Sequence, residues 1–141
     1  MREFVDTNVF LYAYDPSAGD KHAAARELVG RLGSSREGVL SVQVLQEFYV
    51  NVTRKIAVPL SPPEAIDRLR VLAAWPTFSP TAQDVVAAAE LALHAQLSFW
   101  DAMVVQGAAA SGCKILWSED LNSGQVISGV LIRNPFEGAG R

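Results

Sequence analysis

Short apolar runs and longer amphipathic stretches alternate along the chain. A short apolar run is typical of a buried strand, whereas apolar residues that recur every three or four positions are typical of a helix. The short runs predict strands at 2–5, 38–41, 77–78, 114–117 and 129–133. The longer period predicts helices at 8–14, 20–32, 42–57, 61–75, 79–95 and 99–111.

Several of the predicted helices carry end signals. The run Ser61-Pro62-Pro63-Glu64 has the spacing of a capping box with proline in the first helical turn. Ser98 is expected to cap the helix at 99–111, and Gly33 is expected to end the helix at 20–32. Strands separated by such helices imply an α/β fold, in which a mostly parallel sheet has helices on both faces.

The length of 141 residues and the hydrophobic content of 50% suit one domain with one core. No repeat, low-complexity tract or linker interrupts the chain, so we expect a single domain over 1–141. Its folded part is expected to run from Glu3 to Phe136, and the tail after Pro135 is expected to be frayed.

The net charge of −3 argues against a broad basic surface for nucleic acids, but not against an acidic site that meets phosphate through metal ions. No apolar run approaches the roughly 18 residues of a membrane span, and the N-terminus lacks the pattern of a secretion signal. These features predict a soluble, cytoplasmic protein with no membrane association. The one cysteine, Cys113, excludes an intramolecular disulfide and is expected to be a small buried side chain.

Two acids follow predicted strands directly or closely. Asp6 comes after the strand at 2–5, and Asp120 comes after the strand at 114–117. Ligands of parallel sheets bind beyond the carboxyl ends of the strands, so both acids should reach one edge. Each also has a plain structural explanation, because Asp6 can cap the next helix and Asp120 can be a loop acid before a turn.

Two further acids lie on predicted helices. Glu47 falls nearly opposite the apolar stripe of its helix, which favours a solvated position, although the helix begins at the same sheet edge. Asp101 stands three residues after Ser98 in a helix-start pattern, which is compatible with capping and with metal binding. Carboxylates gathered at one edge repel each other, and Mg²⁺ or Mn²⁺ would remove that cost and suit phosphodiester hydrolysis.

The other chemistry-bearing side chains have structural interpretations. His22 and His94 lie in helical patterns and are expected to be structural. Trp75, Trp100 and Trp117 lie in apolar contexts that predict core positions, although Trp100, beside Asp101, can also line the site and stack a base.

Four stretches of the chain, in order, resemble the motifs of the PIN domain and, within that family, of the VapC-type toxins. They are Phe4-Val5-Asp6-Thr7-Asn8-Val9, Leu40 to Phe48, Ser98-Phe99-Trp100-Asp101-Ala102 and Leu116 to Asn122. The closing run at 129–136 is also similar to the end of that family. Each motif is short, so the specificity of the resemblance comes from the ordered set.

The resemblance implies a PIN-like three-layer α/β/α sandwich. It implies that the acids are catalytic residues that bind Mg²⁺ or Mn²⁺, and that Asn8 and Ser118 orient carboxylates or waters beside them. Asn122 is expected in the same surroundings, but it stands where many family members carry a further acid, and its amide offers an oxygen without charge. The implied ligands are Asp6, Glu47, Asp101 and Asp120.

The implied function is a metal-dependent endoribonuclease, the toxin of a type II toxin–antitoxin system, which hydrolyses RNA phosphodiesters by metal-activated water. The resemblance also implies a homodimer and a cognate antitoxin that covers the site. Two alternatives stay open. One is a phosphatase with Asp6 as nucleophile, although Asn8 stands where such enzymes carry a second Asp. The other is a PIN-like binding domain that has lost catalysis.

Overall fold

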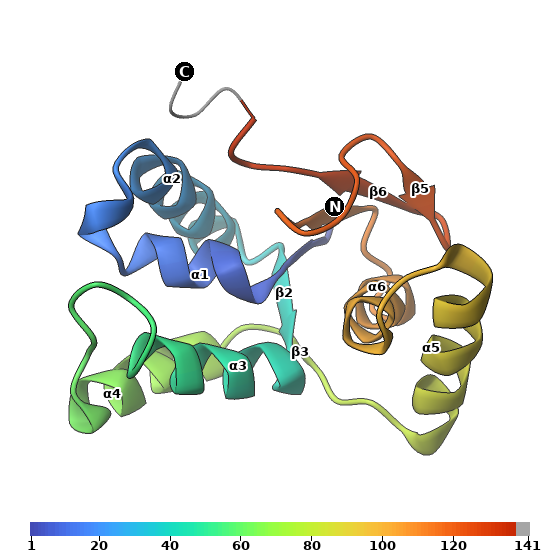
Figure 1. Cartoon of the computed structure of the whole chain (residues 1–141), viewed down its shortest axis with the longest axis horizontal. Coiled ribbons are helices and arrows are strands. Elements are labelled where there is room, and N and C mark those ends of the chain that lie inside the picture. The colour runs from blue at the N-terminus through green and yellow to red at the C-terminus, as the bar shows by residue number, and fades with distance from the viewer. Residues whose placement is uncertain (138–141) are drawn as a thin grey trace.

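The computed structural model describes residues 1–137 and contains one six-stranded sheet in the order β3-β2-β1-β4-β6-β5 (Figure 1). All neighbouring strands are parallel except β5, which is antiparallel to β6. The strands are β1 (Glu3–Val5), β2 (Gly38–Ser41), β3 (Thr77–Phe78), β4 (Ile115–Trp117), β5 (Val126–Ile127) and β6 (Val130–Arg133). The helices are α1 (Thr7–Ala13), the 3-10 turn η1 (Pro16–Ala18), α2 (Asp20–Ser35), α3 (Val42–Val52), α4 (Pro62–Ala73), α5 (Ala82–Ala95) and α6 (Phe99–Ala110).

The helices cover both faces of the sheet, with α1 to α4 on one side and α5 and α6 on the other (Figure 1). The expected three-layer α/β/α sandwich with a mostly parallel sheet is therefore confirmed. The central strands are buried from both sides, which explains why their sequences are continuous apolar runs rather than alternating ones. Their fully buried side chains include Phe4, Val39, Leu40, Leu116 and Ile132.

Three predicted helix boundaries were wrong. The helix α5 begins at Ala82, capped by Thr81, rather than at 79. The helix α2 passes through Gly33 and ends at Ser35, because Arg36 takes the left-handed conformation that ends it (φ 60°). The helix α3 ends at Val52 rather than at 57. Ile56 continues the apolar period of α3, but it packs against the core from the turn that follows the helix.

The strand β5 was not predicted, and β6 begins at Val130 rather than at Gly129. Ser128 and Gly129 join the two strands, and both have positive φ (52° and 76°). A two-residue turn of this kind matches the twist of a β-hairpin, so the Ser-Gly pair in the sequence was a signal from which the hairpin could have been predicted.

The tail after Pro135 was expected to be frayed, and this expectation is wrong for Phe136. Residues 138–141 lie outside the described residues. Phe136 is buried and packs edge-on against Tyr12, with the ring centroids 4.9 Å apart. Cys113 is buried as expected, and burial raises the pKa of its thiol to about 11. No helix within residues 1–137 is long and apolar enough to cross a membrane.

Candidate active site

Four acids from separate segments line one small pocket beyond the carboxyl ends of β1, β2 and β4. Asp6 follows β1, Glu47 lies in the second turn of α3, Asp101 lies in the first turn of α6, and Asp120 lies in the loop after β4. The pocket has a volume of about 80 Å³, and Thr7, Asn8, Gln43, Asn51, Trp100 and Val104 complete its lining. The fold thus brings the four predicted acids together.

Asp6 is the most deeply buried of these acids, with 6% of its surface exposed. One carboxylate oxygen accepts a hydrogen bond from the backbone N–H of Thr7 (2.7 Å), and the other accepts one from the Ser118 hydroxyl (2.9 Å). The hydrogen bond from Thr7 caps α1, so the Asp6 side chain both caps a helix and lines the pocket.

Glu47 accepts a hydrogen bond from the Thr7 hydroxyl (2.8 Å), which ties α3 to the start of α1. The side of α3 opposite its apolar stripe faces the pocket, because Gln43 and Asn51, four residues before and after Glu47, also line it. The helical periodicity was therefore correct in placing Glu47 on a polar face, and that face is the wall of the pocket. Thr7, Gln43 and Asn51 were missed, although the spacing of four residues around Glu47 was a signal.

Asp120 is held by two groups that the sequence predicted beside the acids. The side-chain amide of Asn8 donates to both carboxylate oxygens of Asp120 (3.2 and 3.3 Å). The Ser118 hydroxyl accepts from the backbone N–H of Asp120 (3.2 Å) while it donates to Asp6, so Ser118 links the two acids. The position two residues after Asp6 is an asparagine, so it offers no acid for phosphatase chemistry.

Asp101 is placed by its helix start. The Ser98 hydroxyl accepts from the backbone N–H of Asp101 (3.1 Å) and caps α6. The carboxylate of Asp101 has no hydrogen bond to any described residue, so it is available to a ligand in the pocket.

Asn122 and Glu119 lie apart from the four acids. The amide of Asn122 reaches Gln125 (3.5 Å) and does not line the pocket. Glu119 accepts hydrogen bonds from the Tyr12 hydroxyl (2.9 Å) and the Lys21 ammonium (2.6 Å), so it points away from Asp120. Neither residue is in the lining of the pocket, so neither adds a ligand oxygen to the four carboxylates there.

The acids perturb one another. Burial raises the pKa of Asp6 to about 7, the charges of Asp120 and Glu47 add to the rise, and the bonds from Thr7 and Ser118 oppose it. Burial also raises the pKa of Asp120, and the charge of Asp101 acts in the same direction. No Lys, Arg or His is among the described residues that line the pocket, so this excess of negative charge has no protein counter-ion there.

The donor set fits a hard divalent cation. Carboxylate oxygens are the ligands that Mg²⁺ and Mn²⁺ prefer, and a bound cation would relieve the repulsion that raises these pKa values. Within residues 1–137, no group of three or more His, Cys, Asp or Glu side chains is placed so that it could hold a metal ion as the side chains stand. The side chains whose chemistry would suit a cation are the four carboxylates that share the pocket lining, those of Asp6, Glu47, Asp101 and Asp120.

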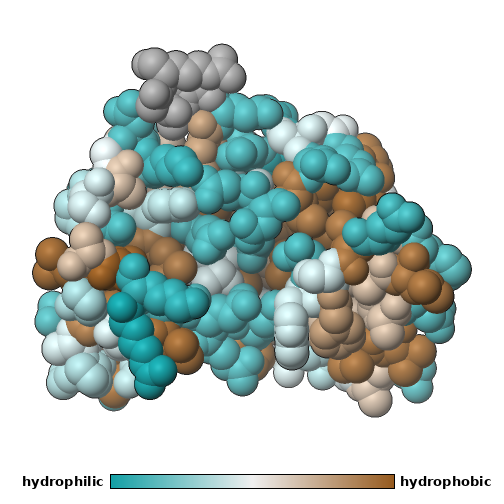
Figure 2. Space-filling model, in the orientation of Figure 1, coloured by the Kyte–Doolittle hydropathy of each residue, from teal (hydrophilic) through white to brown (hydrophobic). Residues whose placement is uncertain are grey.

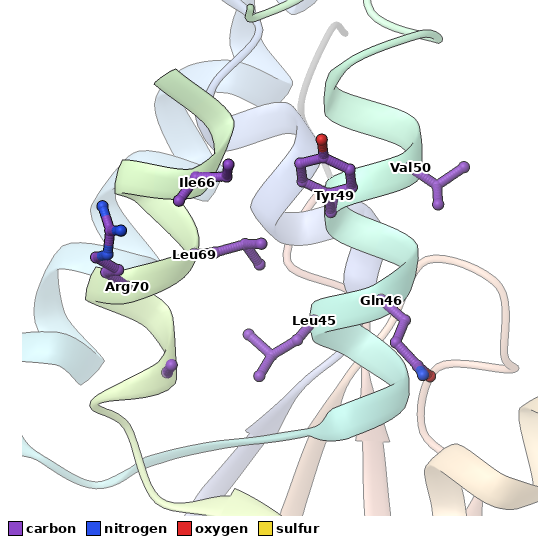
Figure 3. Close-up of a pocket in the computed structure, with 8 residues that line it drawn as sticks. Leu45, Gln46, Tyr49, Val50, Ile66, Leu69 and Arg70 are labelled. Atoms are coloured by element: carbon purple, nitrogen blue, oxygen red, sulfur yellow. The ribbon is translucent and has the colours of Figure 1, made fainter. Parts of the chain in front are cut away.

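A larger groove lies between α3 and α4 (Figure 3). Its lining shares no residue with that of the acidic pocket. It has a volume of about 530 Å³, and apolar side chains of both helices form its walls. It contains none of the acids, so its size does not make it the catalytic site. Its lining residues are Leu45, Gln46, Tyr49, Val50, Ile66, Leu69, Arg70 and Ala73.

Sequence comparison identifies the family. A profile of the PIN domain matches residues 4–126, which include all four acids of the pocket. The chain therefore belongs to the PIN domain family. A search of curated protein sequences finds no match.

Solved structures with the same fold include toxins and toxin–antitoxin complexes. VapC20 of Mycobacterium tuberculosis, a toxin that cleaves the sarcin-ricin loop, has a TM-score of 0.63 and 21% identity, covering 84% of this chain and 89% of that one. VapBC2 of Rickettsia felis, bound to a promoter DNA fragment, has a TM-score of 0.65 and 16% identity, covering 95% and 98%. DNA-bound VapBC of Salmonella typhimurium has a TM-score of 0.66 and 15% identity, covering 96% and 98%. At these identities the likeness is one of fold.

Proposed function

We propose that this protein is a Mg²⁺- or Mn²⁺-dependent endoribonuclease, the toxin of a type II toxin–antitoxin system, which acts in the cytoplasm. The observation that carries the proposal is the convergence of four carboxylates on one small pocket without a basic side chain in its lining. Membership of the PIN family and the fold shared with VapC toxins support it. The inactive binding-domain alternative is less well supported, because none of the four acidic positions is degenerate.

The chain's own residues would hold the site in a fixed geometry. Thr7 orients Asp6 through its backbone and Glu47 through its hydroxyl. The Ser118 hydroxyl donates a hydrogen bond to Asp6, and the Asn8 amide donates one to Asp120. Such hydrogen bonds reduce the reorganisation that carboxylates need before they can bind a cation. When bound, the cation would supply the activated water and the charge stabilisation that phosphodiester hydrolysis needs.

The proposal is tested by incubating RNA with the purified protein in Mg²⁺, in Mn²⁺ and in EDTA. Cleavage should require the cation and should be lost in Asp101→Asn and Glu47→Gln. The matched controls are Asp67→Asn on α4 and Glu90→Gln on α5, which change exposed acids outside the pocket. Cleavage that persists in the pocket variants, or that fails equally in the controls, would contradict the assignment of the site.

We further propose a cognate antitoxin and a second copy of the chain as partners. The structural neighbours solved as VapBC complexes support the antitoxin, and the apolar α3–α4 groove offers it a surface next to the helix that carries Glu47. Figure 2 shows apolar side chains gathered over α5, where Val85, Val86 and Leu93 are exposed, and this surface supports a homodimer. Leu93→Glu, examined by light scattering, should lower the mass of the particle if α5 forms the dimer contact.

A further inference from the structure

Trp100 is an exposed aromatic side chain at the rim of the acidic pocket. It lies in the first turn of α6, directly before Asp101, and 62% of its surface is exposed. The apolar context of Trp100 predicted a core position, and that prediction was wrong. It is the one aromatic among the large exposed apolar residues of the described chain. A single exposed apolar residue is ordinary by itself, so the place of Trp100 beside the acids is what matters.

The backbone and ring of Trp100 are supported from the protein side. The Gln43 amide donates a hydrogen bond to the Trp100 carbonyl (3.4 Å), which connects the first turns of α3 and α6. The Phe99 ring packs edge-on against the indole, with the centroids 5.1 Å apart and the planes at 75°. Phe99 packs in turn against a small buried cluster between α5 and α6. The indole is therefore braced from one side while most of its surface faces solvent.

The pocket is large enough for a phosphate group but too small to enclose a base. A volume of about 80 Å³ is far below the roughly 300–1,000 Å³ of pockets that enclose small organic ligands. A cation, its waters and phosphate oxygens suit such a space, whereas an aromatic base has to lie outside it. Trp100 is the aromatic surface that the rim offers to that base.

We propose that Trp100 is a stacking platform for an unpaired RNA base next to the phosphate that the acidic pocket receives. The inference rests on the proposed nuclease function and adds a specificity-determining residue to it. Proteins recognise single-stranded RNA by stacking splayed bases on aromatic side chains, and each stacked base contributes about 1–3 kcal/mol. Since every base has an aromatic face, the preference is for unpaired nucleotides rather than for a particular base.

The binding test uses intrinsic fluorescence in an Asp101→Asn background, with Mg²⁺ present, so that the RNA is not cut. Titration with a short single-stranded oligoribonucleotide should quench the fluorescence, and the same strand in a duplex should not. Trp100→Phe should bind with an affinity close to that of the parent but lose the quench, because Trp75 and Trp117 lie outside the pocket. Trp100→Ala and Trp100→Leu should bind roughly five- to 150-fold more weakly, as the loss of one stacked base implies.

The kinetic test uses the same Trp100 substitutions with Asp101 intact. Trp100→Leu keeps the apolar character but removes the stacking face, so KM should rise while kcat at saturating RNA stays close to that of the wild type. Trp100→Phe should restore KM. Because Trp100 is exposed, all three variants should melt within a few degrees of the wild type, which separates the effect from misfolding.

The proposal is overturned if Trp100→Leu and Trp100→Ala bind and cut as the wild type does, or if the quench survives in Trp100→Phe. A change in particle mass without a change in RNA binding would also overturn it, because Trp100 would then belong to a protein interface. The two proposals fail separately. Quenching by RNA without cleavage by the wild type refutes the nuclease and leaves the stacking, whereas cleavage that ignores Trp100 refutes the stacking alone.

Discussion

Asp6→Asn should stabilise the metal-free protein at alkaline pH, although it removes an acid from the proposed site. Burial is the main cause that raises the pKa of Asp6 from 3.8 to about 7. Between these two pKa values the folded state holds a proton that the unfolded chain has lost. The free energy of unfolding therefore falls as the pH rises through this window, and the loss is complete above it. An asparagine carries no charge and removes this dependence.

The size of the effect follows from the shift. A rise of about three pKa units corresponds to about 4 kcal/mol, since each unit is worth about 1.4 kcal/mol. This is a ceiling, because the buried site relaxes around the charge and the amide forms weaker hydrogen bonds with Thr7 and Ser118 than the carboxylate does. We expect a gain of about 2 kcal/mol near pH 8, or roughly 4–8 °C in Tm for a chain of this size.

The assay is thermal unfolding in EDTA at about pH 4.5 and about pH 8, on either side of most of the titration window. The variant should melt above the wild type near pH 8 and close to it near pH 4.5. Asp67→Asn, on the exposed surface of α4, should show no such difference. Equal stability at pH 8, or an equal gain at both values, would refute the electrostatic reasoning. Added Mg²⁺ should raise the Tm of the wild type more than that of Asp6→Asn.

Three further predictions concern packing, positioning and reactivity. Gly38→Ala should lose about 1–3 kcal/mol in urea unfolding, because the added methyl would lie 2.4 Å from the Trp75 ring, whereas Gly30→Ala, in open space on α2, should gain up to about 1 kcal/mol. A loss at both glycines would contradict the packing argument. Thr7→Val removes the hydroxyl that holds Glu47 and should lower kcat for RNA cleavage about 10-fold, whereas Thr7→Ser should recover the rate. Cleavage by Thr7→Val at the wild-type rate would show that Thr7 does not position Glu47. Cys113 should resist alkylation near pH 8 in the folded state, because it is buried and its thiol pKa is raised to about 11; rapid labelling of folded protein would contradict this.

The local sequence pattern predicted most of the secondary structure correctly. It failed at the end of α2, where a residue could either continue the helix or take the left-handed conformation that ends it. Gly33 has the residue type that ends helices, yet the helix continues through it and Arg36 takes the left-handed position. Gly33 lies beside the Trp75 ring, so the space there is set by packing between segments far apart in the chain. Such a choice depends on neighbours that no local window contains.

The sequence by itself determined the order of the helices and of every strand except β5, and which acids stand at strand ends and helix starts, because these follow from local periodicity and capping. Only the tertiary structure decided what each polar face meets. Periodicity alone favoured a solvated position for the side of α3 that carries Glu47. That side lines the pocket because α3 packs beside α1 and its first turn is hydrogen-bonded to the first turn of α6. Trp100 was predicted to be buried, and it is exposed because Phe99 takes the place behind it. Periodicity gives the direction of a side chain around its own helix, whereas the packing of that helix against distant segments determines what lies in that direction.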